Sequence, residues 1–423
     1  RECEHWQQQL VAATRDSSVC IVFGNVGCDW RRRGEDGRPR KYNAAVVAAH
    51  GGVITHPGTG LPFVPKTLLP NYREFDDSRY FFDTRKLAYE RQVSVASLLT
   101  PVPVTLGSEV VRLGILVCED SWDTDYGVSP LSIVTQHAPD IILNLSSSPY
   151  SAGKPEIRRQ VFSLAAQKAG VPVCYTNKVG LQNLGKTLFT FDGGSAIYWP
   201  DGEMTPPLNP FLEATVDSPL PIHQLVAASH ENKSLSVAPQ PNPYDMPLLF
   251  KALQYGLQEF LRQIRVKRVV IGASGGIDSA VSAALFASFL PPEDLLLVNM
   301  PSRFNSATTR QLAEDLASRL GCKYGTVPID DSVNLTIRQI DNLEITSCGK
   351  HQLSERLELS GINIENIQAR DRSSRILAAI ASAFGGVFIC NANKAETTVG
   401  YSTLYGDQSG AICPLADLWK HQV

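Results

Sequence analysis

The sequence contains no run of about 18 apolar residues, so no segment is a candidate for a membrane span. It has no excess of one charge, with 39 Lys and Arg against 42 Asp and Glu, which argues against broad binding to nucleic acid or anionic membranes. No two of its nine cysteines have the C-x-x-C spacing. This disfavours a disulfide framework and a zinc site and is typical of a reducing cytosol. We therefore expect a cytoplasmic protein without a nucleic-acid or membrane partner.

The sequence also lacks an initiator Met, and its last residues carry no turn or capping signal. Glu2 and Glu4 interrupt the first residues and no apolar segment follows them, so the start is not a signal peptide. The 423 residues predict two to three domains. We expect a fragment that is truncated at both ends.

Residues 1–202 alternate short apolar runs with turn residues, which predicts an α/β domain with many strands. A basic run at 31–41 surrounds a turn signal, and we interpret it as a solvated hairpin tip rather than a nucleic-acid patch. The expected strands cover residues 19–23, 44–49, 53–56, 111–117, 141–145, 171–176 and 195–198. The expected helices cover residues 129–137 and 155–169.

The pattern changes after residue 202. Residues 203–244 hold eight prolines and little periodicity, which predicts an extended linker. From 245 to 423 strands and helices alternate, which predicts a doubly wound parallel sheet. The expected strands there cover residues 269–271, 295–299, 325–329 and 387–390, and the expected helices cover 246–264, 279–289, 306–320 and about 363–384.

A glycine-rich segment at 272–279, GASGGIDS, follows the first strand of this second domain and opens a helix. Glycines allow a tight turn that brings backbone N–H groups onto phosphate oxygens, and the helix N-terminus adds unpaired donors. The segment lacks the lysine of a Walker A loop and has Asp278 instead. A carboxylate repels phosphates unless a divalent cation bridges them, so Asp278 predicts Mg²⁺. A capped glycine turn without a nucleotide is the less favoured alternative.

The string SGGIDS after a buried strand resembles the ATP pyrophosphatase (PP-loop) family, which attacks the α-phosphate of ATP and releases pyrophosphate. Residues 365–372, 393–396, 399–407 and 414–420 resemble NAD⁺ synthetases. This resemblance covers about 245–423 and implies a Rossmann-like domain that uses ATP and Mg²⁺ on deamido-NAD⁺. Ala395 stands where that family usually has Ser, and we expect this to remove a hydroxyl contact but not the activity.

The resemblance also implies roles for single residues. Those that would hold ATP are Ser274, Gly275, Gly276, Asp278, Ser279, Asn391 and Lys420. Those that would hold deamido-NAD⁺ are Arg370, Arg372, Glu396, Tyr401 and Leu404, and the metal ligands would be Asp278 and Glu396. Taken singly, the two arginines are better explained by surface ion pairs on a helix, and Glu396 by a solvated helix face. The surrounding strings favour the functional interpretation.

Cys118 stands at the end of an apolar strand and precedes two acids, Glu119 and Asp120. A free cysteine is usually a small buried hydrophobic residue, which suits several of the other eight. Acids alone would raise the pKa of a thiol, so a nucleophile at this position needs a nearby cation. Lys66 is the best candidate, because an ammonium there would favour the thiolate and stabilise an oxyanion. The alternative is an exposed loop lysine.

Residues 66–81, 118–120 and 144–149 resemble the lysine, cysteine and following segments of the nitrilase superfamily. This resemblance covers about residues 1–200. It implies an α-β-β-α sandwich with a Glu-Lys-Cys triad, in which Cys118 and Lys66 are catalytic. In the glutaminase branch, Tyr72, Ser148 and Lys154 fall where glutamine is held. Lys154 stands where Arg is common, so the charge survives but the bidentate geometry does not.

The general-base Glu of that superfamily lies on an early strand, ahead of the segment with which this sequence starts. Glu2 and Glu4 stand in a helical pattern, so we assign the role to neither. If the molecule begins at Arg1, we expect severely reduced glutaminase turnover, since loss of a general base costs about 10²–10⁴-fold.

Together the two resemblances imply the glutamine-dependent NAD⁺ synthetase family. Glutamine would be hydrolysed at Cys118, and ATP would drive amidation of deamido-NAD⁺ with release of AMP and pyrophosphate. The partners would be glutamine, ATP and deamido-NAD⁺, in a homo-oligomer formed through the synthetase domain. Two alternatives stay open: an ammonia-dependent synthetase with an inactive nitrilase-like domain, and a non-catalytic fragment that acts as an assembly module.

Overall fold

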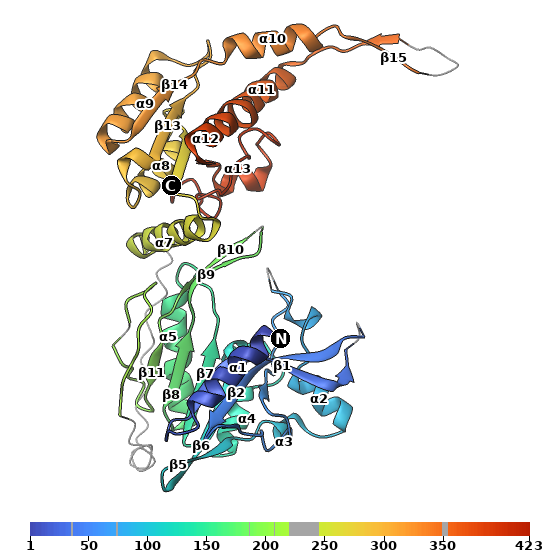
Figure 1. Cartoon of the computed structure of the whole chain (residues 1–423), viewed down its shortest axis with the longest axis vertical. Helices are drawn as coiled ribbons and strands as arrows, with labels where there is room; N and C mark the ends of the chain where they lie inside the picture. The colour runs from blue at the N-terminus through green and yellow to red at the C-terminus, as the bar shows by residue number, and fades with distance from the viewer. Residues whose placement is uncertain (35–36, 73–74, 186, 207, 220–244, 349–353) are drawn as a thin grey trace. The chain divides into compact units, whose positions relative to one another are not determined.

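The structure is a computed structural model that describes residues 1–34, 37–72, 75–185, 187–206, 208–219, 245–348 and 354–423. The chain divides into two compact units, Arg1–Asp245 (unit 1) and Met246–Val423 (unit 2) (Figure 1). Most of the expected linker, residues 207 and 220–244, lies outside the described residues. Within the described ranges, no helix is long and apolar enough to cross a membrane.

The described part of unit 1 contains two larger β-sheets and one two-stranded sheet. The first is antiparallel around a central β2 and consists of β1 (Ile21–Arg33), β2 (Pro39–Ala49), β3 (Gly52–Val53) and β4 (Val64–Pro65). The second has the order β11-β8-β7-β6-β5, in which β6, β7 and β8 run parallel. Its strands are β5 (Val102–Leu106), β6 (Glu109–Val117), β7 (Ile141–Ser146), β8 (Val173–Asn177) and β11 (Ala196–Tyr198).

Of the five α-helices described in unit 1, three contact these two sheets and the other two, at 84–91 and 95–98, contact each other (Figure 1). The five helices are α1 (Glu2–Ala13), α2 (Thr84–Arg91), α3 (Val95–Leu98), α4 (Pro130–Gln136) and α5 (Lys154–Ala169). Short 3₁₀ helices cover Asp77–Arg79 (η1) and Cys118–Ser121 (η2). A separate hairpin joins β9 (Val179–Asn183) to β10 (Leu188–Asp192).

Successive side chains of β6 point to opposite faces of its sheet, and each face packs against a different layer of unit 1. Leu113 and Ile115 belong to a buried cluster with Val47 of β2, so this face of β6 packs against the first sheet. Leu116 belongs to a second cluster with Phe162 of α5, so the opposite face packs against helices. Together with α1, which lies along β1 and β2, this arrangement is the expected α-β-β-α sandwich.

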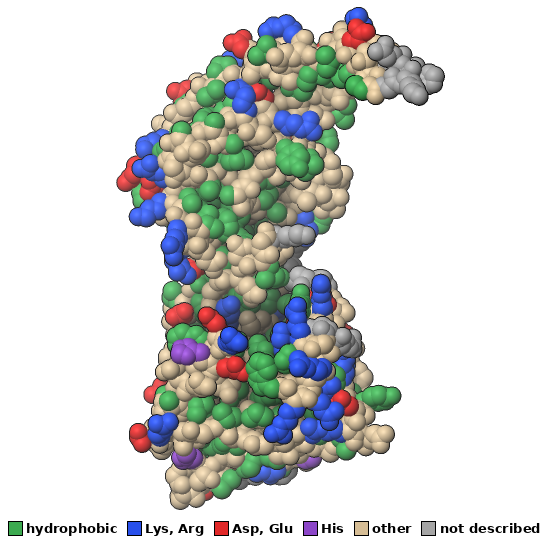
Figure 2. Space-filling model, turned by 45° about the vertical axis from the view of Figure 1, so that its right-hand side comes forward, with side chains coloured by type: hydrophobic (Ala, Val, Ile, Leu, Met, Phe, Trp, Pro, Cys, Tyr) green, Lys and Arg blue, Asp and Glu red, His purple; other side chains and the backbone are tan. Residues whose placement is uncertain are grey.

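The expected hairpin tip at 31–41 lies on β1 and β2, with residues 35–36 outside the described residues. Arg31, Arg32 and Arg33 are exposed, whereas the Arg40 guanidinium bonds Glu90 and lies 3.8 Å from the Phe82 ring centroid. Figure 2 shows Lys and Arg side chains gathered on one face of this unit. The run is therefore a mixture of solvated and internally paired charges.

Unit 2 is a doubly wound α/β domain, as expected. Its sheet has the order β14-β13-β12-β17 and all its pairings are parallel. The strands are β12 (Arg268–Gly272), β13 (Leu295–Asn299), β14 (Lys323–Thr326) and β17 (Gly386–Phe388). From β12 the chain adds β13 and then β14 on one side of β12, and it later adds β17 on the other side. The strand order therefore reverses between β12 and β17. Ligands of such sheets bind where the order reverses, outside the carboxyl ends of the strands.

The helices of unit 2 connect these strands. They are α7 (Met246–Ile264), α8 (Ile277–Ala287), α9 (Ala307–Leu320), α10 (Asp330–Ile340), α11 (Gly361–Arg370), α12 (Ala378–Phe384) and α13 (Lys394–Val399). A 3₁₀ turn covers Pro292–Asp294, and a hairpin joins β15 (Glu344–Thr346) to β16 (Ser354–Arg356). A π-helical segment, Asp371–Leu377, joins α11 to α12, so the expected helix over about 363–384 is continuous but locally underwound into a wider turn.

Three strand predictions need correction. The strand expected over 19–23 begins at Ile21 and continues to Arg33, through the first part of the basic run. The strand expected over 325–329 lies at 323–326, because Pro328 has no N–H for the ladder and Ile329 already caps α10. The strand expected over 53–56 is only Gly52–Val53, since His56 turns inward and its Nδ1 lies 3.0 Å from the Thr59 hydroxyl.

Candidate active sites

Cys118 lies at a sharp turn where β6 ends. Its φ of +49° is in the left-handed region, which is unusual for a residue other than glycine and typical of functional sites. Asn144 of the neighbouring strand β7 holds this turn, because its Nδ2 donates to the Cys118 carbonyl at 3.3 Å and to the Ser121 hydroxyl at 2.7 Å. The thiol therefore stands on a fixed turn at the carboxyl end of a parallel strand.

Lys66 lies beside this turn and is 2% exposed. Its Nζ donates to Asp77 Oδ2 at 2.9 Å. Burial acts to lower the pKa of Lys66, but the negative charges of Cys118, Asp77 and Asp120 outweigh that effect and raise it. The lysine is therefore a buried ammonium that interacts electrostatically with Cys118, which excludes the alternative of an exposed loop lysine.

Two of the residues expected to hold glutamine share this neighbourhood. The Tyr72 hydroxyl donates to Glu119 Oε1 at 2.9 Å, and the Tyr126 hydroxyl donates to the same atom. Lys154 Nζ donates to the Pro149 carbonyl at 3.0 Å. Burial lowers the pKa of Lys154, although the charge of Cys118 acts in the opposite direction. Tyr72 and Lys154 thus both lie in the field of Cys118.

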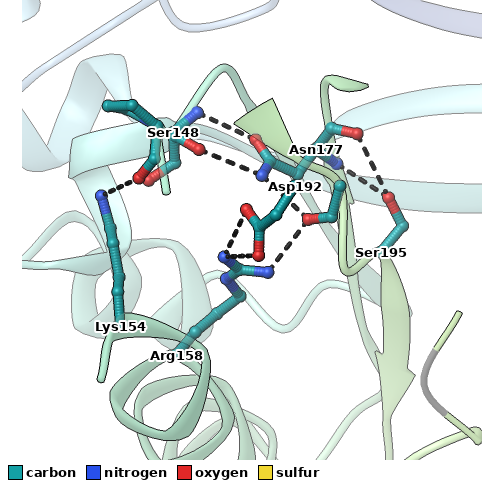
Figure 3. Close-up of polar contacts among 8 residues, drawn as sticks. Ser148, Lys154, Arg158, Asn177, Asp192 and Ser195 are labelled. Carbon is teal, nitrogen blue, oxygen red and sulfur yellow. Dashed lines mark hydrogen bonds and ion pairs between the residues drawn. The ribbon is translucent and has the colours of Figure 1, made fainter. Parts of the chain in front are cut away.

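A buried polar network supports the segment that carries Ser148 (Figure 3). Asn177 accepts the Ser148 N–H at 2.8 Å and donates to the Ser148 and Gly193 carbonyls. Arg158 also donates to the Gly193 carbonyl, and its Nη2 bonds both oxygens of Asp192 at 2.9 and 2.8 Å. Both side chains of this ion pair are almost fully buried, so the network fixes the loop rather than offering a free charge.

The glycine-rich segment at 272–279, the candidate phosphate loop of unit 2 (below, the phosphate loop), has the predicted strand–loop–helix form, between β12 and α8. Gly276 is the residue that precedes the helix, and its N–H bonds Ser274 Oγ at 3.2 Å. Ser279 Oγ donates to the Gly276 carbonyl at 2.9 Å and lies 3.4 Å from Ser274 Oγ. Gly275 has φ +84°, a conformation that favours glycine. The loop is therefore held in one shape, with the N-terminus of an 11-residue helix behind it.

The loops after β12 and β17 meet at the point where the strand order reverses. Asn391 Nδ2 donates to the Gly272 carbonyl at 3.0 Å, and its buried Oδ1 has no partner among the described residues. Asp278 accepts a hydrogen bond from Asn393 Nδ2 at 3.0 Å and pairs with Lys420. Three residues expected to bind ATP, Asn391, Asp278 and Lys420, thus converge on one edge of the sheet.

Glu396 contributes to the same edge indirectly. Its Oε2 accepts the Asn393 N–H at 2.9 Å, and Asn393 Oδ1 in turn accepts the Ala395 and Glu396 N–H groups, which forms a capping box for α13. The contacts of Glu396 are thus those of a helix cap. No group of three or more His, Cys, Asp or Glu side chains in the described part of the chain could hold a metal ion. A Mg²⁺ site built from Asp278 and phosphate oxygens still fits, because Mg²⁺ commonly takes one or two carboxylates and completes its shell with phosphates and water.

The two candidate arginines lie around the start of the π-helical segment. Arg372 Nε donates to the Met300 carbonyl at 3.2 Å, just past the carboxyl end of β13, and burial lowers its pKa. Arg370 Nε donates to the Leu404 carbonyl at 3.2 Å. The side chains of Tyr401 and Leu404 are exposed. Arg372 therefore reaches the strand edge, whereas Tyr401 and Leu404 lie on an exposed loop that α11 holds through Arg370.

Comparisons with known proteins agree with this architecture. Residues 249–423 match the NAD synthase family model. The chain is 30% identical over 422 residues to the glutamine-dependent NAD⁺ synthetase of Synechocystis sp., covering 98% of this chain and 67% of that protein. It is also 30% identical to the Thermotoga maritima enzyme of the same name, covering 100% of this chain and 69% of the relative. The chain belongs to the glutamine-dependent NAD⁺ synthetases. It is therefore an enzyme of the ligase class, and it spans about two thirds of these relatives' length.

Solved structures of glutamine-dependent NAD⁺ synthetases share the fold. The Acinetobacter baumannii enzyme in complex with ADP superposes with a TM-score of 0.74 at 26% identity, covering all of this chain and 69% of its own. The Cytophaga hutchinsonii enzyme superposes with a TM-score of 0.70 at 18% identity, which supports the fold alone.

Several residues that hold the sites together were assigned no role from the sequence, although most of them stand in the strings that carry the family resemblance. Asp77, Asn144, Asn177 and Asn393 are polar residues whose importance lies in burial and in partners distant in sequence. Glu2 and Glu4, which we did not assign as the base, lie on α1, where Glu4 accepts the Trp30 Nε1–H at 3.0 Å. The hairpin β9–β10 also escaped prediction, although its end carries Asp192.

Proposed function

We propose that unit 1 hydrolyses glutamine at Cys118 and that unit 2 uses ATP and ammonia to convert deamido-NAD⁺ into NAD⁺. The observation that carries the proposal is Lys66, a buried ammonium in the field of a cysteine that stands on a strained turn. Such a cation favours the thiolate form of a neighbouring cysteine and stabilises an oxyanion. The names of the relatives, which describe this activity, support the proposal.

In unit 1 the thiolate sulfur of Cys118 attacks the carboxamide carbon of glutamine, and the carbonyl oxygen takes up the negative charge. Lys66 stabilises that charge. When the carbon–nitrogen bond breaks, the nitrogen takes up the proton that the thiol has lost and leaves as ammonia, so that a thioester remains. Water then adds to the thioester, the carbon–sulfur bond breaks, and glutamate leaves with the thiol restored. Tyr72, Ser148 and Lys154 would hold glutamine during these steps.

In unit 2 a carboxylate oxygen of deamido-NAD⁺ attacks the α-phosphorus of ATP, and pyrophosphate leaves. Ammonia then attacks the adenylated carbonyl carbon, the bond to AMP breaks, and the amide of NAD⁺ forms with loss of a proton. Residues 274–276 and the first turn of α8 would hold the phosphates, together with Asn391 and Lys420. Bound Mg²⁺ beside Asp278 would neutralise phosphate charge. Arg370 and Arg372 would contact the dinucleotide, with Glu396, Tyr401 and Leu404 near it.

The proposal is tested by measuring NAD⁺ formation with glutamine or with ammonium chloride as the nitrogen source. Cys118→Ala should abolish glutamine-supported synthesis and leave ammonia-supported synthesis intact, because it removes only the nucleophile of unit 1. Asp278→Ala should abolish both, together with Mg²⁺-dependent ATP binding in calorimetry. Cys20→Ala is the matched thiol control and should change neither rate. Equal loss of both rates in Cys118→Ala, or retained ATP turnover in Asp278→Ala, would contradict these assignments.

The same assays separate the two alternatives. An ammonia-dependent synthetase with an inactive unit 1 would make NAD⁺ from ammonium but release no glutamate from glutamine. An assembly module would bind no ATP at all. The homo-oligomer formed through unit 2 stays a prediction from the family resemblance.

A further inference from the structure

Asp120 is a buried carboxylate that connects the segment carrying Lys66 to the segment carrying Cys118. It is 2% exposed. Its Oδ1 accepts the backbone N–H groups of Thr67 at 3.0 Å and Leu68 at 2.7 Å, the two residues that follow Lys66. Its Oδ2 accepts the N–H of Val117 at 3.1 Å, the residue that precedes Cys118. One side chain thus binds backbone that flanks both candidate catalytic residues.

The charge of Asp120 suits this position. Burial raises the pKa of Asp120, and the three backbone donors and Lys66 oppose this effect, so that the pKa is about 6 and the carboxylate is mostly ionised at pH 7. Hydrogen bonds from N–H groups to a carboxylate are roughly twice as strong as neutral ones. A buried, ionised acceptor with three donors therefore resists small movements of either segment.

The neighbouring acids have other partners. Asp77 binds the ammonium of Lys66 itself at 2.9 Å, and Glu119 accepts the hydroxyls of Tyr72 and Tyr126. Among the carboxylates of this site whose contacts are described, Asp120 alone bonds the main chain on both sides. Its contribution is geometric, through the backbone, rather than direct contact with glutamine.

We infer that Asp120 is a positioning residue for glutamine hydrolysis, which fixes Lys66 against Cys118 by binding the main chain next to each of them. The inference rests on the roles proposed above for Cys118 and Lys66. A displacement of about 1 Å in a reacting group can cost about 10²-fold in rate. Loosening this link should therefore slow glutamine hydrolysis without affecting the ammonia-supported reaction of unit 2.

Asp120→Asn is the informative variant. Its amide oxygen can still accept the Thr67 and Leu68 N–H groups, but its NH₂ group then faces the Val117 N–H, so two donors oppose each other. If the Asn amide is turned the other way, its oxygen accepts the Val117 N–H, but its NH₂ group faces the Thr67 and Leu68 N–H groups and those two hydrogen bonds are lost. Asp123→Asn is the matched control, because Asp123 lies three residues along the same segment and bonds the Ser129 hydroxyl instead.

The readout is the pH dependence of Cys118 alkylation by iodoacetamide, with Cys118→Ala as the blank, alongside kcat/KM for glutamine. A positioning role predicts that Asp120→Asn raises the midpoint of the alkylation profile, because Lys66 no longer supports the thiolate, and lowers kcat/KM by 10-fold or more. A merely electrostatic role predicts the opposite shift, since removing a nearby negative charge lowers the thiol pKa. A lowered or unchanged midpoint would overturn the inference. Asp123→Asn should leave the profile unchanged.

Hydrogen exchange on the unmodified protein supplies a second measurement that does not require the variant to fold. The Thr67, Leu68 and Val117 amides should exchange at least 10-fold more slowly than in an unfolded peptide, and exchange at the unfolded rate would overturn the inference. The proposed function fails separately. An unreactive Cys118 in the unmodified protein would refute the nucleophile itself, whereas a reactive Cys118 that Asp120→Asn leaves unaltered refutes only the positioning role.

Discussion

Gly275 is the position at which the phosphate loop can be perturbed most cleanly. Its φ is +84°, and a Cβ built on it would lie 2.3 Å from the carbonyl oxygen of Thr309. Thr309 belongs to the first turn of α9, so the obstructing atom is helix backbone and cannot rotate away. Gly275→Ala therefore combines an unfavourable dihedral angle with a steric overlap that only movement of the loop can relieve.

Gly321 separates these two effects. It ends the same helix, α9, with φ +68°, and a Cβ there would have no atom within 4 Å. Gly321→Ala should therefore cost only the left-handed conformation, about 1–2 kcal/mol of folding free energy. In Gly275→Ala the Cβ and the carbonyl must also separate by about 1 Å to reach ordinary contact, and overpacking of this kind costs about 1–3 kcal/mol more. The sum is about 2–5 kcal/mol, unless the loop shifts and loses its shape.

A shift of that size at the phosphate loop should lower kcat/KM for ATP about 100-fold. Both glutamine- and ammonia-supported synthesis should fall together, because both use the same ATP site, while release of glutamate by unit 1 persists. The measurements are ATP titration calorimetry, NAD⁺ formation with each nitrogen source, and urea unfolding of both glycine variants. Gly275→Ala binding ATP as tightly as Gly321→Ala would refute the role of this loop.

Two further predictions concern the stability of unit 1. Asp192→Asn should lower the free energy of unfolding of unit 1 in urea by about 3–5 kcal/mol, because it leaves the buried Arg158 guanidinium without its counter-charge. Asp76→Asn, at the exposed pair with Arg79 in the same unit, should change it little, and equal effects of the two variants would contradict the prediction. Burial lowers the pKa of His56 to about 4, below the unfolded value of about 6.5, so the folded state favours the neutral ring. The resulting stabilisation is about 3 kcal/mol. It is complete above pH 6.5 and is lost as the pH falls toward 4. Urea unfolding between pH 4 and 7 should show this slope in the unmodified protein and a shallower one in His56→Gln, and parallel profiles would contradict it.

Local sequence patterns were sufficient where burial and periodicity coincide. The helix Met246–Ile264 and the strand Leu295–Asn299 have the predicted limits, because each is a regular run bounded by residues that interrupt its pattern. The strand expected over 325–329 shows the limit of this reasoning. An apolar run that contains Pro328 continues past the end of a strand, and only the sheet and the following helix decide where pairing stops.

The residues that hold the sites were predictable only where a motif marked them. The strings assign roles to Lys66, Cys118 and the glycines of the phosphate loop. Asp120 and Asn393 also stand in recognised strings, but their contacts do not follow from them, since Asp120 bonds main chain more than 50 residues away and Asn393 bonds Asp278 across 115 residues. Such contacts depend on which strands become neighbours, and a single sequence does not contain that information locally. Polar residues of this kind are visible only once burial and partners are known.

The two candidate sites are built from the same arrangement of strand, turn and neighbouring Asn, although they lie in different folds. Each stands at the carboxyl end of a strand in a parallel pairing, β6 with β7 and β12 with β13. Each places a residue with positive φ in the turn that follows, Cys118 or Gly275. A buried Asn on the adjacent strand then bonds that turn, since Asn144 donates to the Cys118 carbonyl and Asn299 donates to the Ala273 carbonyl at 3.0 Å. At each site an amide from the neighbouring strand fixes the turn that a helix follows, so loss of either Asn should loosen its own site and leave the other unchanged.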